Sequence, residues 1–453
     1  MVKEKKNGVK PLNKMDVVML AFGAMIGWAW VVQSGSWINT AGTLGAILAF
    51  LLGGIVVLFV GQVYAELTAC VQGRGVLDFA LRGGGRTVAF IATWALVIGY
   101  FSVCAFEAVA LPNVVTYLFP NYQRVYLYSV AGSDIYLTWL AVGVGSSLVI
   151  ATVNYIGVKT AAIVQTVLTI AIALCGIALI SGGFFNGQPA NLKPLFINGA
   201  SGLISVLAMT PFMYVGFDVI PAASSEMRIP QKKVGQILVI SVFLAAMWYI
   251  LIIFGTSLGL SGEELAASSL ATADAMKALY GGSDIASKLL ICGGIAGILT
   301  SWNAFIMGGS RAVAAMAQEG MLPACLGKYH PKYKTPMNAI ILLAALNALA
   351  PLLGSKMMDW LVNAGGMATT TTYLLVSICF IKLRKKEPML LRPYPIRHWK
   401  FFGYGAITLC AVLLIMYMPG MPASLEWPFE WAIIIAWIVL GALLFVLAER
   451  RRS

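Results

Sequence analysis

A carboxylate stands deep inside a long apolar run, where Glu107 follows Cys104, Ala105 and Phe106. An acidic side chain within a membrane span is costly unless it faces a cavity or a partner, so Glu107 is a candidate functional residue. If ionised, it would favour a cationic group on a substrate, and if protonated it could carry a proton. A structural acid bonded to another helix is the alternative interpretation.

A second acid, Asp218, follows a segment that disfavours a continuous helix. The segment begins at Pro211 and holds Gly216, with Pro221 just beyond. Proline removes a backbone donor and obstructs the preceding turn, while glycine tolerates non-helical backbone. The sequence therefore predicts an interrupted helix with a carboxylate beside the interruption.

The first apolar run has a comparable feature, because Gly23 and Gly27 precede Trp28, Ala29 and Trp30. Two glycines four residues apart are also typical of a helix-packing face. The two runs are five helices apart, and interrupted helices at corresponding positions of two halves indicate a transporter with inverted repeats. Half-helix N-termini would present N–H groups to a carboxylate, and exposed carbonyls would suit an ammonium or a small cation. An amino acid carries both charges and fits such a gap.

The composition is that of a membrane protein. Of 453 residues, 60% are hydrophobic and 11% are charged, whereas an ordinary soluble domain carries about 25% charged residues. A chain this apolar would aggregate in water, so the lipid bilayer is its expected surrounding. The net charge of +13 is expected to fix topology rather than to bind nucleic acid. The two histidines lie in separate polar loops and the seven cysteines form no CxxC pair, so no metal or catalytic site is expected from them.

Twelve runs are long and apolar enough to cross the membrane as helices. With the N-terminus in the cytoplasm, all but five of the 31 lysines and arginines fall on the inner side, as the positive-inside rule requires. An even number of spans then leaves both termini cytoplasmic. The first run is too long for a signal peptide, and the chain reads as one domain, 1–453. The predicted outer cations are Arg124, Lys193, Lys277, Lys288 and Lys356. The predicted spans are 14–39, 43–70, 87–119, 135–155, 161–184, 201–222, 235–260, 286–317, 337–354, 358–382, 402–419 and 428–448.

Six short stretches stand in order between residues 12 and 400: Gly23 to Gly27; Tyr64 to Leu67 with Gly73 to Gly75; Asn154 to Lys159 with Gln165; Gly216 to Asp218; Glu319 to Pro323 with Thr335 and Pro336; and Arg392 to Tyr394. Together they resemble the amino acid–polyamine–organocation (APC) transporter superfamily. The resemblance implies an all-α membrane protein with a LeuT-type fold, working by alternating access. Its five-plus-five inverted repeats would occupy about 12–200 and 201–385, with two appended helices at about 400–448.

The resemblance also implies a binding site. A substrate carboxylate would meet the backbone of Ile26, Gly27, Trp28 and Ala29 at the first break. Bulky indoles at Trp28 and Trp30 replace the small residues that relatives often carry; they narrow the space and can stack on a cation. The amine would meet carbonyls near Gly23 and in the sixth span, and Asp218 would lie near the substrate or its gate. The remaining residues expected to form the site are Gly99, Tyr100, Cys104, Glu107, Phe212, Met213, Tyr214 and Val215.

A coupling ion is expected on the same basis. Proton-coupled and ion-independent relatives often hold a lysine in the fifth span, but the corresponding position, about Ile172, is apolar. Thr300 and Ser301 follow a small residue and resemble the sodium site of sodium-coupled members. Five oxygen ligands suit a hard cation, although the two hydroxyls could instead bond to their own helix backbone. The predicted sodium ligands are Gly23, Ile26, Gly297, Thr300 and Ser301.

These observations predict a secondary active transporter of amino acids in a cell membrane, expected to be a bacterial plasma membrane, with sodium coupling favoured over proton coupling. The alternative is an amine or polyamine permease or exchanger in which Glu107 or Asp218 supplies the counter-charge. An enzyme is not expected, because the sequence has no HExxH, nucleophile–base pair or nucleotide-binding motif. A small-molecule substrate and lipid are the expected partners, and no cofactor is expected besides the coupling ion.

Overall fold

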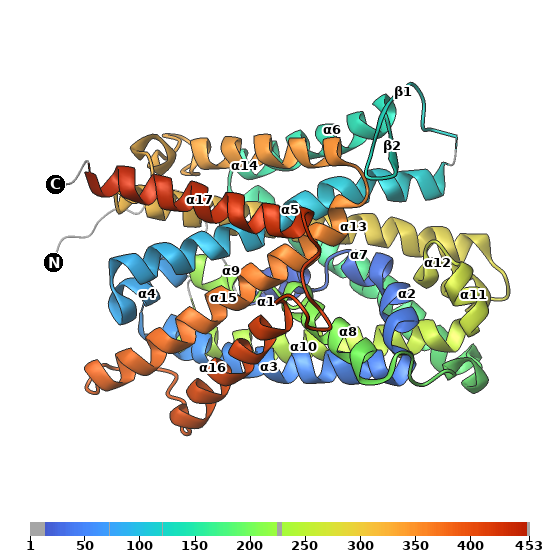
Figure 1. Cartoon of the computed structure of the whole chain (residues 1–453), viewed down its shortest axis with the longest axis horizontal. Helices are drawn as coiled ribbons and strands as arrows, with labels where there is room; N and C mark the ends of the chain where they lie inside the picture. Colours follow the sequence, from blue (N-terminus) through green and yellow to red (C-terminus); the bar gives the residue numbers. More distant parts are fainter. Residues whose placement is uncertain (1–13, 72, 120, 224–228, 451–453) are drawn as a thin grey trace.

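A computed structural model of the chain describes residues 14–71, 73–119, 121–223 and 229–450. The chain is almost entirely helical, with its long helices running roughly side by side (Figure 1). The predicted inner cations at Lys3, Lys5, Lys6, Lys10, Arg228, Arg451 and Arg452 lie outside the described residues.

The first part of the chain forms seven helices and a short hairpin. The helices are α1 (Lys14–Met25), α2 (Ala29–Ala41), α3 (Thr43–Cys70), α4 (Val76–Gly84), α5 (Arg86–Leu118), α6 (Leu137–Ile156) and α7 (Val158–Asn186). Strands β1 (Tyr126–Val130) and β2 (Ser133–Tyr136) pair antiparallel, with Ser129 opposite Asp134. Apart from this hairpin the described chain is helical, as the expectation of an all-α fold requires. The hairpin follows the third predicted span, and β2 overlaps the start of the fourth, 135–155.

The rest of the chain continues with helices of unequal length. They are α8 (Gly199–Met213), α9 (Val219–Ala223), α10 (Gln231–Gly259), α11 (Gly262–Ala267), α12 (Ala271–Leu279), α13 (Asp284–Gln318), α14 (Met337–Leu349), α15 (Met357–Lys386), α16 (Trp399–Met416) and α17 (Phe429–Arg450). Short 3-10 turns lie at Pro189–Leu192, Ala324–Gly327 and Ala350–Leu353.

Ten helices in the described ranges are long and apolar enough to span a membrane, counting α1 and α2 as one interrupted helix. The two other predicted spans correspond to α8 and α14, which are apolar but shorter. These helices make the protein an integral membrane protein. The count of twelve spans, the inverted repeats and the cytoplasmic location of both termini stay predictions.

The interior of the bundle is built from α5, α13 and α15. The most apolar windows of α5 and α13 are 78% buried by the protein itself, whereas that of α17 is 11% buried. An apolar helix that the protein does not cover must face lipid. Thus α17 lies at the periphery, and the site is sought around α5 and α13.

Three ion pairs connect helix ends at one end of the bundle. Arg74 pairs with Glu319 at 2.6 Å, Arg82 with Glu387 at 2.5 Å and Arg86 with Glu449 at 2.5 Å. These contacts place α4 and the C-terminal ends of α13, α15 and α17 on one face of the molecule (Figure 1). All three arginines belong to the predicted inner set.

Candidate functional site

The first predicted interruption is present. Helix α1 ends at Met25, residues Ile26 to Trp28 are not helical, and α2 begins at Ala29. The indole of Trp30 donates to the carbonyl oxygen of Ile26 at 3.0 Å. The break leaves the Ile26 carbonyl without a helical hydrogen bond, and a side chain of the same span supplies one, as a buried backbone group requires.

The second predicted interruption is also present, at Tyr214 to Asp218 between α8 and α9. Gly216 has φ 135°, and a Cβ added there would lie 2.9 Å from the Cβ of Ala24 and 3.0 Å from the backbone nitrogen of Met25. Only glycine readily adopts this backbone conformation and permits this approach. The two interruptions are therefore in direct contact.

Tyr249, on α10, links the two interrupted helices. Its buried hydroxyl lies 2.7 Å from the carbonyl oxygen of Met25 and 3.0 Å from that of Met213, and donates to this pair. Met25 and Met213 are the last residues of α1 and α8. The carbonyl ends of both half-helices thus converge on one hydrogen-bond donor, which is where an ammonium group would also find acceptors.

A small cavity of about 20 Å³ lies at this junction and is lined mostly by buried residues. A water molecule needs about 10–15 Å³ by this measure, so the site is closed around a volume far below that of an amino acid. The lining residues come from α1, α2, α5, α8, α10 and α13 and from both interruptions. They are Ala24, Met25, Gly27, Trp28, Ala29, Val103, Phe106, Glu107, Phe212, Met213, Val215, Tyr249, Ser301 and Phe305.

Glu107 supplies the cavity with its acidic group. Its Oε1 accepts a hydrogen bond from the hydroxyl of Ser301, which ties the carboxylate to α13. Its Oε2 has no hydrogen-bond partner in the described part of the chain. Because a buried carboxylate oxygen without a partner is costly, this atom is the natural contact for a donor on a bound solute.

Asp218 lies at the second interruption but outside the cavity lining. Its Oδ1 accepts from the backbone N–H of Gly216 at 3.0 Å, and its Oδ2 accepts from the hydroxyl of Tyr373 at 3.3 Å. With one partner on each oxygen, Asp218 holds the non-helical segment in place and ties it to α15.

The predicted sodium ligands divide into two groups. The hydroxyl of Thr300 lies 3.2 Å from the carbonyl oxygen of Gly23 and 2.8 Å from that of Gly297. The hydroxyl of Ser301 lies 3.0 Å from the same carbonyl oxygen of Gly297, so four of the five residues are in contact. The Ile26 carbonyl accepts from the Trp30 indole, and the Ser301 hydroxyl bonds to Glu107. The oxygens around Thr300 are hard donors of the kind that sodium prefers. Ser301 joins them through Gly297 and also bonds to Glu107, whereas the Ile26 carbonyl is engaged by Trp30.

Several of the predicted site residues point away from the cavity. Tyr100 packs on Phe305, with ring centroids 5.2 Å apart, and the hydroxyl of Tyr214 donates to the carbonyl of Phe50 at 2.8 Å. Gly23, Gly99, Ile26 and Cys104 are also absent from the cavity lining, although all are buried. The structure brings the following predicted residues together there: Gly27, Trp28, Ala29, Glu107, Phe212, Met213, Val215 and Ser301.

Sequence reasoning missed six lining residues. Val103 and Phe106 lie on α5 at helical spacing from Glu107, but this spacing does not distinguish them from Tyr100 and Cys104, which the cavity excludes. Tyr249 and Phe305 carry no local signal, because only the packing of α10 and α13 against the interruptions brings them to the cavity. The other two, Ala24 and Met25, lie within the glycine-flanked segment of α1.

Comparison with known proteins agrees with this geometry. The family model for amino acid permeases matches residues 16–450. A branched-chain amino acid permease of Bacillus subtilis is 25% identical, covering 98% of this chain and 94% of its own length. A methylthioribose transporter of the same organism is 25% identical over 99% and 95% of the two chains. An aspartate–proton symporter, also from Bacillus subtilis, is 24% identical over 91% and 80%.

These relatives are transporters and none is an enzyme. Because the family model spans nearly the whole chain, the match includes the residues of both interrupted helices. The protein belongs to the amino acid permease family of the APC superfamily.

Proposed function

We propose that this protein is a secondary active transporter of amino acids that works by alternating access and is coupled to a cation, in the plasma membrane of a bacterium. The observation that carries the proposal is the meeting of two interrupted helices at one buried cavity. The start of α2 offers backbone N–H groups to a carboxylate, and the carbonyls of Met25 and Met213 offer acceptors to an ammonium.

The cavity favours a substrate with an apolar side chain. Apart from Glu107, Ser301 and Tyr249, its lining side chains are apolar, with Phe106 and Phe212 among them. A closed site of about 20 Å³ must open to admit such a substrate, as alternating access requires. The relative named as a branched-chain amino acid permease is consistent with this substrate class.

Uptake into proteoliposomes tests the proposal. The purified full chain, reconstituted with imposed sodium, proton or no gradients, should take up radiolabelled leucine or isoleucine in a saturable manner. An excess of unlabelled substrate should compete, whereas the corresponding carboxylic acid without the amine should not. Uptake of no amino acid under any gradient, with the protein shown to be folded and inserted, would contradict the proposal.

Sodium is the proposed coupling ion, supported by the three oxygens that meet at Thr300. Uptake should then be faster in sodium than in choline buffer at equal pH on both sides. Thr300→Ala should reduce the sodium dependence of uptake more than Thr371→Ala does. Thr371 is the control because its hydroxyl, on α15, bonds to its own helix at Met367. Equal uptake in the two buffers, together with stimulation by a proton gradient, would favour proton coupling, as in the relative named as an aspartate–proton symporter.

A second candidate is an amine permease or exchanger with Glu107 as counter-charge. The unpartnered Oε2 of Glu107 favours it, because a cation there would satisfy a buried anion. Asp218 is the weaker choice, since both of its oxygens have partners. This candidate would be supported if putrescine competed for uptake more strongly than leucine. The competition by putrescine should then be lost in Glu107→Gln and kept in Asp218→Asn. Stronger competition by leucine in the native protein would exclude it.

A further inference from the structure

Exposed cations cluster on and beside the segment that connects α15 to α16. We call this cluster the α15–α16 basic surface and define it by five exposed cations: Lys382, Lys385, Lys386, Arg397 and Lys400. Two large apolar side chains of this segment are exposed, Met389 by 95% and Leu391 by 81%, and Phe401 in the first turn of α16 is 65% exposed. Cations interleaved with uncovered apolar side chains are typical of a surface that sits in the headgroup region of a bilayer.

The nearby acids do not neutralise these five cations. Glu66 accepts a hydrogen bond from Arg384 at 2.5 Å and forms an ion pair with Arg392 at 3.0 Å, and Glu387 pairs with Arg82. None of the five cations that define the surface has an acidic partner in the ranges that the structure describes. The surface therefore keeps a positive charge of five that only an external group can balance.

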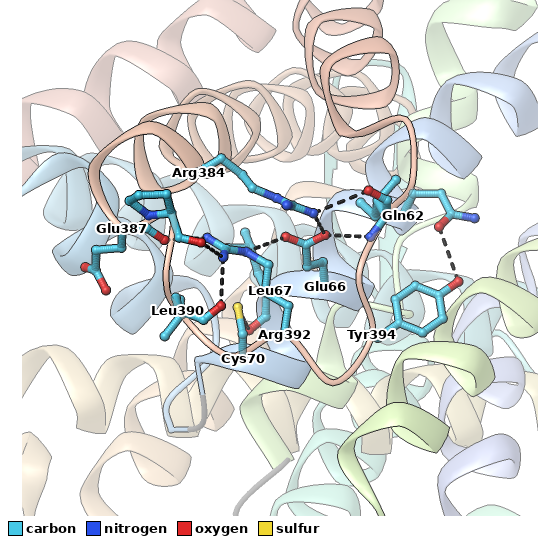
Figure 2. Close-up of polar contacts among 11 residues, drawn as sticks. Gln62, Glu66, Leu67, Cys70, Arg384, Glu387, Leu390, Arg392 and Tyr394 are labelled. Carbon is cyan, nitrogen blue, oxygen red and sulfur yellow. Dashed lines mark hydrogen bonds and ion pairs between the residues drawn. The ribbon is translucent and has the colours of Figure 1, made fainter.

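The segment is held in a fixed shape by the buried Glu66 of α3 (Figure 2). Besides its two arginines, Glu66 accepts from the backbone N–H of Ile396 at 2.8 Å, and the hydroxyl of Tyr394 donates to Gln62 at 3.3 Å. The guanidinium of Arg392 also donates to the carbonyl oxygens of Glu387 and Leu390, at 2.9 and 2.8 Å (Figure 2). Because these bonds fix the backbone, Met389 and Leu391 are exposed in an ordered segment.

Aromatic rings place the surface at the membrane boundary. The ammonium of Lys400 lies 5.7 Å from the ring centre of Trp399, and that of Lys385 lies 6.0 Å from that of Tyr404. Tryptophan and tyrosine concentrate where hydrocarbon meets headgroups. The positive-inside rule assigns this face to the inner leaflet, where anionic headgroups attract clustered cations next to a membrane span.

We infer that the α15–α16 basic surface binds the headgroups of anionic phospholipids, with Met389, Leu391 and Phe401 inserted at the boundary with the acyl chains. Five cations beside the end of a membrane helix fit a phosphate-bearing headgroup, which offers several acceptor oxygens and negative charge. A nucleic acid or an acidic soluble protein would match the charge but would leave the three apolar side chains in water.

The test compares lipids on the full-length transporter. The protein is placed in nanodiscs of phosphatidylcholine alone, or with part of it replaced by phosphatidylglycerol, and its melting temperature and retained lipids are measured. The basic-surface variant changes Lys382, Lys385, Lys386, Arg397 and Lys400 to Gln. The matched control changes five other exposed cations of the predicted inner face to Gln, at Lys232, Lys233, Lys328, Lys332 and Lys334.

Phosphatidylglycerol should raise the melting temperature of the native protein and of the control variant. In the basic-surface variant the rise should disappear, and the affinity for the anionic lipid should fall about tenfold or more. A second variant, Met389→Ser with Leu391→Ser, keeps all five cations and should also weaken retention of the lipid.

Three outcomes would overturn the inference. The control variant could lose the effect as fully as the basic-surface variant, which would mean that net charge alone attracts the lipid. Soluble glycerol phosphate could stabilise the protein as well as the lipid does, or the native protein could be indifferent to phosphatidylglycerol. Because the readout is lipid binding rather than uptake, none of these results bears on the proposed amino acid transport.

Discussion

The hydroxyl of Ser301 donates a hydrogen bond to the carboxylate of Glu107, across the contact between α13 and α5. A Cβ added at Gly27 would lie 2.5 Å from the Oγ of Ser301 and 3.3 Å from the Oε1 of Glu107. The first interruption, α5 and α13 therefore meet at one hydrogen bond. The Ser301 hydroxyl, which the sequence predicts as a sodium ligand, thus contacts the acid of the cavity.

Ser301→Ala should lower both stability and uptake. Removing the donor leaves a buried carboxylate oxygen without its partner, which costs about 1–3 kcal/mol in the free energy of unfolding. The matched control is Ser310→Ala on the same helix, because the Ser310 hydroxyl bonds only to the carbonyl of Met307 one turn away among the described residues. Thermal melting and uptake measure the two effects. Equal behaviour of both variants would show that the contact between Ser301 and Glu107 has no special role.

Tyr249→Phe should impair transport more than its effect on stability explains. The change leaves the carbonyls of Met25 and Met213 without their shared donor, at a cost of about 1–3 kcal/mol. Tyr214→Phe is the control, since its hydroxyl also donates to a buried carbonyl, that of Phe50, but does not line the cavity. We expect similar melting temperatures for the two variants and a changed KM for Tyr249→Phe alone. A shift of KM in both, or in neither, would contradict the assignment of Tyr249 to the site.

Gly216→Ala should abolish uptake. The new Cβ would overlap Ala24 and the backbone of Met25, and φ 135° is strained for alanine, so we expect a loss of about 3 kcal/mol or more. Gly320→Ala separates backbone strain from steric overlap, because Gly320 has φ 66° but no atom lies within 4 Å of a new Cβ. That control should cost about 1–2 kcal/mol from strain alone. Melting of both variants in detergent gives the comparison, and full uptake by Gly216→Ala would refute close contact between the interruptions.

Glu66→Gln should destabilise the protein severely. It leaves the guanidinium groups of Arg384 and Arg392 without their shared anion, and breaking a buried pair costs about 3–5 kcal/mol. Glu387→Gln breaks the exposed pair with Arg82, for which about 0–1 kcal/mol is expected. The difference in melting temperature between the two variants is the measurement. A smaller loss in Glu66→Gln than in Glu387→Gln would show that the buried cluster is not a stabilising contact.

The interruptions could be predicted because they depend on local backbone chemistry. Gly216 forms the second break as expected, although Pro211 itself lies inside α8 rather than at the break. In the first span the break falls at Gly27, while Gly23 stays helical and packs beside Thr169. Proline and glycine signal that a helix can break, but the neighbouring helices select the residue at which it does.

The side-chain face of α5 was harder to predict. Glu107 was identified because a carboxylate in an apolar run is rare, but its expected companions Tyr100 and Cys104 do not line the cavity. The cavity receives Val103 and Phe106 instead. A helix that is apolar all round gives no periodic signal for the face it turns inward. Tyr249 was out of reach for the same reason, since its two acceptors are more than 30 residues away in sequence.

The central claim is that a substrate binds in the cavity between the two interrupted helices, and Gly27→Ala tests it most directly. A methyl group there would lie 2.5 Å from the Oγ of Ser301, inside the cavity. Gly61→Ala on α3 is the control, because its new Cβ would make ordinary contacts of 3.5 Å or more. We predict saturable leucine uptake by the native protein and by Gly61→Ala. A folded Gly27→Ala variant should lose this uptake. Unchanged uptake by Gly27→Ala would contradict the account.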